Sequence, residues 1–192
     1  MRIIAGTHRG RNYLGPEGDE VTRPITDRVK ENLFNRLHSL GVLGYGKVLD
    51  VFAGTGSMGM EALSRGAEHC TFVERDRSGV DRLQENLDTF GFGPDQAVVR
   101  ASDALGGVWM LPLDDGSITL AFLDPPYPLT SESLEPFEAL LVELLPKMEP
   151  GGVVLLRTAE DVVAKDVAGY DGMARIVDGT MGLHFYQAPL SE

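Results

Sequence analysis

The chain has 192 residues, of which 43% are hydrophobic and 24% are charged, and this composition is typical of one globular domain with a sizeable core. No apolar run reaches the roughly 18 residues that a membrane span requires, and the first residues lack the long apolar stretch of a secretory signal. The one cysteine, Cys70, excludes an intramolecular disulfide, and four scattered histidines give no zinc-ligand spacing. We therefore expect a cytoplasmic protein with no membrane contact and no metal ion.

The net charge of −12 is unevenly distributed. Residues 1–47 hold eight Lys/Arg against five Asp/Glu, whereas the remainder holds nine against 24. A basic segment on an acidic body can still contact phosphates, because salt confines the field of each charge to its surroundings. Charge alone leaves open whether the amino-terminal part binds nucleic acid or is simply solvated.

The amino-terminal residues are rich in glycine and arginine and contain a turn at residues 14–19. A helix is expected from Thr26, with Thr26 or Asp27 as its cap and apolar residues at helical spacing up to Leu37. We therefore divide the chain into a basic arm or β-hairpin over residues 1–25 and one Rossmann-like domain over residues 26–192.

Strands and helices alternate through that domain. Strands are predicted at residues 47–51, 70–74, 97–100, 118–123, 153–156, 174–177 and 183–187. Helices are predicted at residues 59–65 and 80–90 and after Ser133. This alternation is typical of an α/β fold in which helices cover both faces of a mostly parallel seven-stranded sheet. Such sheets bind ligands outside the carboxyl ends of their strands.

The first strand leads into a glycine loop, "VLDVFAGTGSMG", in which Gly54, Gly56 and Gly59 satisfy G-x-G-x-x-G, with Glu74 lying 20 residues after Gly54. The same pattern marks dinucleotide sites, and alone it is a weak signal. Asp50 favours S-adenosylmethionine, because a carboxylate would repel a pyrophosphate but attract the ammonium and sulfonium groups of that donor. The alternative is that the glycines only form a tight strand-to-helix turn.

Acidic residues follow the next two strands. Glu74 ends the second strand, where it can accept hydrogen bonds from both ribose hydroxyls. Asp103 follows the third strand and can accept from the adenine amino group, with Ala104 donating through its backbone; a surface turn is the alternative for Asp103. The further expected cofactor contacts are Phe52 and Arg75.

The strand at residues 118–123 ends in Asp-Pro-Pro-Tyr, which suits the methylation of an exocyclic amino group. Such a nitrogen is a poor nucleophile because its lone pair is delocalised, so a site must hold both N–H bonds while the nitrogen pyramidalises. Asp124 can accept one bond and the Pro125 carbonyl the other, Pro126 stiffens the loop, and Tyr127 offers a flat face for the target ring. Asp124 can also take the proton. The alternative is a chance tetrapeptide in a turn.

In combination, four stretches resemble the bacterial small-subunit ribosomal RNA guanine-N2 methyltransferases (RsmD-like) over nearly the whole chain. These stretches are "MRIIAGTHRGRNY", "TRPITDRVKENLFNRL", "VLDVFAGTGSMGMEALSRGAEHCTFVERD" and "FLDPPY". The resemblance implies a class I methyltransferase fold, S-adenosylmethionine as donor, and ribosomal RNA or the small ribosomal subunit as partner. It also implies cofactor contacts at Asp50, Gly54, Gly56, Glu74 and Asp103 and a catalytic loop at Asp124, Pro125, Pro126 and Tyr127.

Two basic stretches are expected to face the RNA. The segment "TRPITDRVKE" resembles the element of the family that covers the cofactor and faces RNA, which implies cofactor contacts at Arg23 and Thr26 and an RNA contact at Arg28. On its own terms, "GTHRGR" suits phosphate contact through Arg9 and Arg11, because it is small and positively charged. The alternative is a hairpin whose arginines are solvated. The chain departs from the family at Ile25, where Thr is usual, and it is less basic.

Several rival functions share these motifs. A methyltransferase that acts on the amino groups of DNA adenine or cytosine holds the acceptor with the same kind of loop. Such an enzyme usually carries a target-recognition domain, for which 192 residues leave no room. A protein glutamine methyltransferase typically has Asn as the first residue of the tetrapeptide. A non-catalytic RNA-binding assembly factor with this fold would need neither motif. We expect a monomeric RNA methyltransferase.

Overall fold

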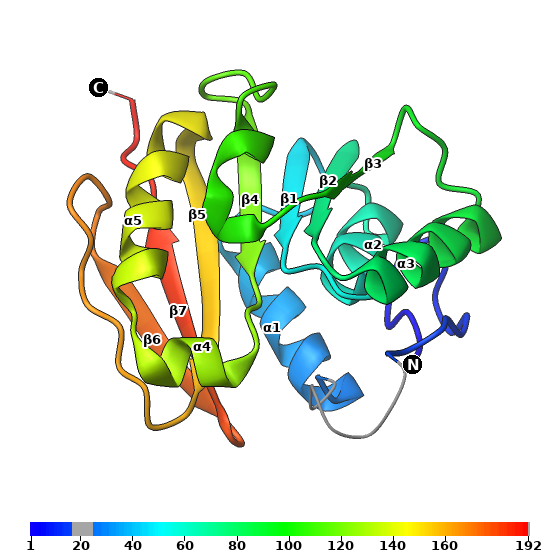
Figure 1. Cartoon of the computed structure of the whole chain (residues 1–192), viewed down its shortest axis with the longest axis horizontal. Coiled ribbons are helices and arrows are strands. Elements are labelled where there is room, and N and C mark those ends of the chain that lie inside the picture. The colour runs from blue at the N-terminus through cyan, green and yellow to red at the C-terminus, as the bar shows by residue number, and fades with distance from the viewer. Residues whose placement is uncertain (17–24, 192) are drawn as a thin grey trace.

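A single seven-stranded sheet forms the centre of the computed structural model, which describes residues 1–16 and 25–191 (Figure 1). The strand order is β3-β2-β1-β4-β5-β7-β6. The strands are β1 (Lys47–Val51), β2 (His69–Glu74), β3 (Ala97–Ala101), β4 (Ile118–Leu123), β5 (Met148–Ala159), β6 (Met173–Asp178) and β7 (Met181–Gln187). The first five strands are parallel, whereas β7 runs antiparallel to β5 and β6. This arrangement confirms the predicted Rossmann-like α/β fold.

Helices cover both faces of the sheet. The helices are α1 (Asp27–Ser39), α2 (Ser57–Ser64), α3 (Arg77–Phe90), α4 (Tyr127–Glu132) and α5 (Glu135–Leu144), with short 3-10 segments at Ala104–Gly106, Val108–Met110 and Leu145–Lys147. Apolar residues of α1, α2 and α3 pack on one face, and those of α5 pack on the other. Successive residues of β4 alternate between the two cores, with Phe122 in the first and Leu123 in the second. This burial on both faces explains the continuous apolar run of that strand.

Polar side chains cap the starts of two helices, as predicted for Thr26, and two other elements differ from the prediction. Thr26 caps α1, and Asp76 caps α3 by accepting a 2.8 Å hydrogen bond from the Gly79 N–H. The short helix α4 directly follows the two prolines, where we expected only a loop; Pro128 stands in its first turn, which tolerates proline. Strand β5 is longer than predicted at both ends. After Leu156 it continues to pair with β7, and before Val153 it pairs with β4 at Met148, where the register shifts.

The arm folds back on itself at its start. Arg2 and Asn12 form an antiparallel bridge, and the Ile3 N–H donates to the Arg11 carbonyl at 3.0 Å. Ile3 and Tyr13 are buried in the core that contains α1 and α2. The proposed boundary at residue 25 adjoins residues 17–24, which lie outside the described part of the chain. Among the described helices, none combines the length and the apolar character that crossing a membrane would require.

Candidate active site

A cavity of about 450 Å³ opens at the carboxyl ends of β1, β2 and β4, where ligands bind in folds of this kind. Seven of the predicted site residues line it: Phe52, Gly54, Glu74, Arg75, Ala104, Asp124 and Pro126. The other lining residues are Pro16, Thr55, Val73, Asp76, Ser78, Gly79, Arg82 and Leu129. The glycine loop, the end of the second strand and the Asp-Pro-Pro-Tyr loop therefore meet at one hollow, as their positions after parallel strands require.

The glycine loop brings backbone to the cavity. Gly54 has a φ of +53° and an added Cβ would meet nothing within 4 Å, so its backbone is open to a ligand. Gly59 serves packing instead, because a Cβ there would lie 2.3 Å from the Phe72 ring and 2.6 Å from Cys70 Sγ. Phe52 also has a positive φ, of +65°, which is strained for a bulky residue.

Glu74 is fixed by backbone donors of the same cavity. Its Oε2 accepts from the Gly54 N–H at 2.7 Å, and its Oε1 accepts from the N–H groups of Arg75 and Asp76 at 2.9 and 2.8 Å. A carboxylate offers about four acceptor positions, so these three bonds orient the group and leave capacity for a ligand. Glu74 thus connects the second strand to the glycine loop.

Asp50 lies beneath the glycine loop. Its side chain is buried, and Oδ2 accepts a 2.7 Å hydrogen bond from the Gly59 N–H in α2. Burial raises the pKa of the Asp50 carboxyl to about 8, against the lowering effect of that hydrogen bond. Asp50 is not among the described residues that line the cavity, so a contact between this carboxylate and the cofactor remains a prediction.

The Asp-Pro-Pro-Tyr loop is anchored to β1 at its start. The Asp124 N–H donates to the Val51 carbonyl at 3.1 Å, which continues the ladder between β4 and β1 by one residue. Asp124 and Pro126 line the cavity, whereas Pro125 is buried. Tyr127 is half-buried as the first residue of α4 and packs against the core that contains α1. In the described structure Tyr127 does not line the cavity, and its stacking on a target base remains a prediction.

Arg157 is the residue beside this loop that sequence reasoning missed. It lies on β5, and its Nε is 2.5 Å from Asp124 Oδ1. Burial raises the pKa of the Asp124 carboxyl, and the Arg157 guanidinium opposes that rise. The sequence does carry a signal for this contact. An arginine directly after the apolar run 153–156 falls at the same sheet edge as Asp124.

The remaining cofactor predictions have local roles in the structure. Gly56 is the left-handed cap of α2, and Thr26 caps α1. Asp103 is exposed and accepts from the Leu105 N–H at 3.2 Å, the geometry of a surface turn, while its neighbour Ala104 does line the cavity. Arg23 lies outside the described residues.

The predicted RNA contacts differ in how they are held. Arg9 is exposed on the arm. Arg11 donates to the Thr89 carbonyl at 2.7 Å, and its guanidinium carbon lies 4.5 Å from the centre of the Phe90 ring. Arg28 pairs with Asp178 at 3.0 Å. Arg11 and Arg28 therefore have protein partners that an RNA phosphate would have to share or replace.

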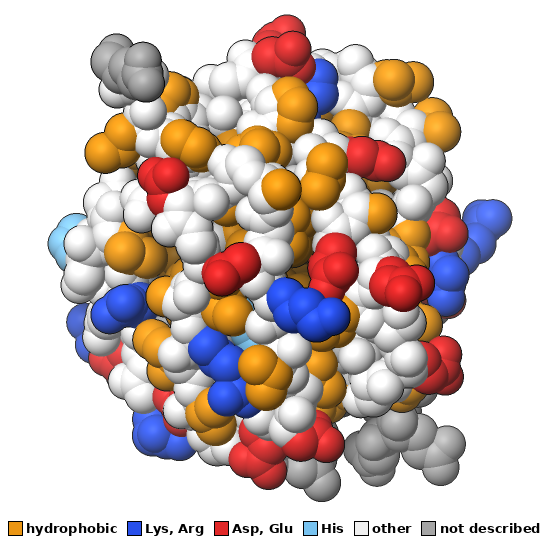
Figure 2. Space-filling model, turned by 90° about the vertical axis from the view of Figure 1, so that its left-hand side faces the viewer, with side chains coloured by type: hydrophobic (Ala, Val, Ile, Leu, Met, Phe, Trp, Pro, Cys, Tyr) orange, Lys and Arg blue, Asp and Glu red, His pale blue; other side chains and the backbone are white. Residues whose placement is uncertain are grey.

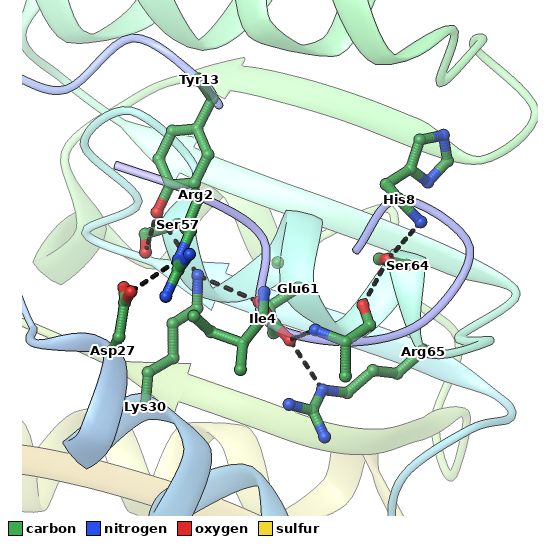
Figure 3. A network of polar contacts seen from close by, with 12 residues as sticks. Arg2, Ile4, His8, Tyr13, Asp27, Lys30, Ser57, Glu61, Ser64 and Arg65 are labelled. Atoms are coloured by element: carbon green, nitrogen blue, oxygen red, sulfur yellow. Dashed lines mark hydrogen bonds and ion pairs between the residues drawn. The ribbon is translucent and has the colours of Figure 1, made fainter. Parts of the chain in front are cut away.

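A buried ionic network fixes the arm to the domain (Figure 3). The Glu61 carboxylate accepts from the N–H groups of Ile4 and Ala5 at 2.8 and 3.0 Å. It also lies 3.2 Å from Lys30 Nζ and 2.8 Å from Arg65 Nε. Because Glu61 and Lys30 are both buried, this network joins the arm, α1 and α2 inside the core.

Two further side chains join the arm to the glycine loop. The Tyr13 hydroxyl lies 2.6 Å from the hydroxyl of Ser57, which follows Gly56 directly. Buried Asn86 of α3 donates to the carbonyls of Leu14 and Thr55, both at 3.0 Å. Sequence reasoning missed both contacts, because each joins elements that are far apart along the chain.

Comparison with known proteins relates the chain to one family. The profile of the family described as "Conserved hypothetical protein 95" matches residues 1–187. The protein YlbH of Bacillus subtilis, provisionally named an rRNA methyltransferase, is 35% identical over 91% of this chain and 97% of its own length. Ribosomal RNA small subunit methyltransferase D of Haemophilus influenzae is 42% identical over 66% of this chain and 64% of its own length.

A solved structure agrees in fold over the whole chain. The yhhF protein of Escherichia coli, provisionally named a methyltransferase, superposes with a TM-score of 0.79 and 30% identity, covering 100% of this chain and 99% of its own. The match extends from the arm to the last strand, so it includes every part of the cavity described above. The chain therefore belongs to the family described as Conserved hypothetical protein 95, the family of the RsmD-like ribosomal RNA methyltransferases.

Proposed function

We propose that this protein transfers a methyl group from S-adenosylmethionine to the exocyclic N2 amino group of a guanine in small-subunit ribosomal RNA. One observation carries the proposal: Asp124 and Pro126 line the same cavity as Glu74 and Gly54. A carboxylate suited to hold an amino group therefore faces the site suited to hold the methyl donor. The family's relatives that are named as ribosomal RNA methyltransferases support the choice of substrate.

The residues of the cavity fit the methyl donor. The Glu74 carboxylate, oriented by three backbone N–H groups, keeps one acceptor position on Oε2, which can accept a ribose hydroxyl. Val73 and Leu129 give apolar surface for the adenine, beside the backbone of Ala104. S-adenosylmethionine supplies an electrophilic methyl group on a sulfonium. The protein's task is to present the acceptor nitrogen in line with that methyl.

Asp124 and Pro125 would hold the acceptor. The Asp124 carboxylate accepts one N–H of the guanine amino group, and the Pro125 carbonyl accepts the other. With both N–H bonds held, the nitrogen pyramidalises and its lone pair becomes available for attack. After the transfer Asp124 can take the proton that the positively charged nitrogen loses. Pro126, at the start of α4, keeps the carbonyl of the preceding residue in place.

The described part of the arm, residues 1–16, offers three exposed arginines and no acidic side chain to the RNA. Arg9 is exposed there, and residues 1–47 hold eight Lys/Arg against five Asp/Glu. By contrast, acidic and basic side chains are interspersed on the face of the molecule that carries α5 and β6 (Figure 2). We therefore place the RNA on the side of the arm, next to the cavity that Pro16 helps to line.

The proposal is tested by methyl transfer from tritiated S-adenosylmethionine to small ribosomal subunits that lack the modification, followed by digestion of the RNA to nucleosides. We expect the label in N2-methylguanosine. Parallel reactions with naked ribosomal RNA and with duplex DNA separate the substrates. Label in N6-methyladenine or N4-methylcytosine of DNA would support the rival nucleobase methyltransferase, and no label in any acceptor would support a non-catalytic binding protein.

A further inference from the structure

Arg157 and Asp124 occupy equivalent positions on neighbouring parallel strands. Leu156 of β5 pairs with Leu123 of β4, so the next residue of each strand falls at the same edge of the sheet. The Arg157 Nε lies 2.5 Å from Asp124 Oδ1, and the two side chains are 10% and 21% exposed. The register of the sheet therefore forces a cation against the carboxylate that ends β4.

The same guanidinium also contacts the far end of the Asp-Pro-Pro-Tyr loop. Its central carbon lies 5.7 Å from the centre of the Tyr127 ring, within the range of a cation–π interaction. On its other side, Nη1 lies 3.9 Å from Met181 Sδ of β7. Arg157 thus touches both ends of the tetrapeptide from a strand that is remote from it in sequence.

We propose that Arg157 is a positioning residue for methyl transfer, which binds Asp124 Oδ1 and so directs Oδ2, as an ionised oxygen, toward the amino group of the substrate. The inference rests on the proposed function of Asp124 as the acceptor of an N–H. A protonated carboxyl would lose charge and acceptor capacity, so the reaction depends on keeping Asp124 ionised in a site that is largely closed to water. The contact with Tyr127 fixes the other end of the loop.

Among the charged groups near Asp124 in the described structure, Arg157 is the one that favours the ionised carboxylate. Arg157 of β5 is the cation that lowers the pKa of the Asp124 carboxyl, against the effect of burial. On β1 the pKa of the Asp50 carboxyl is raised by its burial and, to a smaller extent, by the negative charges of Asp124 and Glu74. From α4 comes the ring of Tyr127, which lies 5.7 Å from the Arg157 guanidinium carbon. On β7, His184 lies beside Thr158, 3.0 Å from its hydroxyl, and burial lowers the pKa of this histidine to about 4.

The test compares Arg157→Met, which keeps bulk and removes charge, with Arg157→Lys, which keeps the charge. Arg175→Met is the matched control, because Arg175 lies on β6 and donates to the Glu160 carbonyl rather than to Asp124. The pH profile of kcat is measured with saturating S-adenosylmethionine. Loss of the cation raises the pKa of Asp124, so the acid limb should move to higher pH by about 1–3 units in Arg157→Met, with the rate recovering at alkaline pH. Arg157→Lys and Arg175→Met should keep the limb of the wild type.

A second readout does not depend on activity. The carbon-13 signal of the Asp124 carboxyl, titrated in the free protein, should show the same rise in pKa in Arg157→Met. If neither the acid limb of the kcat profile nor the pKa of Asp124 moves in Arg157→Met, the inference is overturned. An equal loss of kcat at every pH would overturn it as well, because that result indicates a purely structural role. If the wild-type protein transfers no methyl group, the proposed function fails as well, and the titration still shows whether Arg157 controls the Asp124 carboxyl.

Discussion

The side chain of Asn86 is bonded twice to the backbone of Leu14. Its oxygen accepts from the Leu14 N–H at 2.8 Å, and its nitrogen donates to the Leu14 carbonyl at 3.0 Å. The same nitrogen donates to the carbonyl of Thr55, which lines the cavity. One buried amide therefore holds the arm at Leu14 against the glycine loop at Thr55, so the same side chain supports the proposed RNA surface and the proposed cofactor site.

Replacing that amide should weaken both parts. We expect Asn86→Ala to lower the free energy of unfolding by about 1–3 kcal/mol, because buried backbone groups lose their partners. The affinity for S-adenosylmethionine should fall as well, since the Thr55 backbone loses its anchor. Urea unfolding and titration calorimetry measure the two effects. Gln84→Ala is the control on the same helix, because Gln84 is exposed and bonds to exposed Asp88. Equal behaviour of the two variants would contradict the role of Asn86.

The Glu61 network should carry a large share of the stability. We expect Glu61→Gln to lower the free energy of unfolding by about 3–5 kcal/mol, because Lys30 keeps its buried position without a counter-charge. Burial already lowers the pKa of Lys30, and Glu61 opposes that effect. Exposed Glu31→Gln in α1 is the control and should change the stability by less than about 0.5 kcal/mol. Thermal unfolding that is alike in both variants would show that the network is dispensable.

Glu74 should control the affinity for the methyl donor. We expect Glu74→Ala to weaken S-adenosylmethionine binding by about 10- to 100-fold, because a charged acceptor for the ribose and the anchor of Gly54 are lost together. Calorimetry measures this directly. Glu68→Gln, exposed just before the same strand, should leave the affinity unchanged. An unchanged affinity in Glu74→Ala would overturn the ribose assignment.

Asp50 should make the stability of the free protein depend on pH. Its pKa is about 8 when folded and about 3.9 when unfolded, so the folded state holds the extra proton between these values. The stability that the folded protein gains from this proton is complete below about pH 4 and is lost as the pH rises toward about 8. Compared with Asp50→Asn, the wild-type protein should therefore lose stability across this range. Parallel profiles for the two proteins in urea unfolding would show that Asp50 is not protonated.

The strands, their carboxyl-end residues and the caps were accessible to sequence reasoning because each is encoded locally. Apolar runs indicate the strands, and Thr26 stands directly before the helix that it caps. Parallel strands place their carboxyl ends at one edge of the sheet, so the sequence alone assigns Glu74 and Asp124 to a common site. The family assignment rests on the same local motifs, in combination.

The contacts that were missed depend on how distant segments come together. Arg157 meets Asp124 only through the register of β5 on β4, and Asn86 meets Leu14 only through the packing of α3 beside the arm. Helix α4 was missed for a different reason: its prolines indicate a loop, but one of them stands in the first turn, where a helix needs no N–H. The buried position of Asp50 likewise follows from the close packing of α2 on the sheet.

The central claim is that the Asp-Pro-Pro-Tyr loop holds the amino group to which the methyl group is transferred. The Asp124→Asn substitution tests this claim most directly. The amide keeps the shape of the side chain but cannot hold the developing charge or take the proton, so kcat should fall by about 10²- to 10⁴-fold. Asp114→Asn in the exposed turn before β4 is the matched control. The measurement is tritium transfer to unmodified small ribosomal subunits, with S-adenosylmethionine affinity measured alongside. We predict label in N2-methylguanosine with the wild-type protein and the control, and near-loss of label with unchanged affinity in Asp124→Asn. Full transfer by Asp124→Asn would contradict the account.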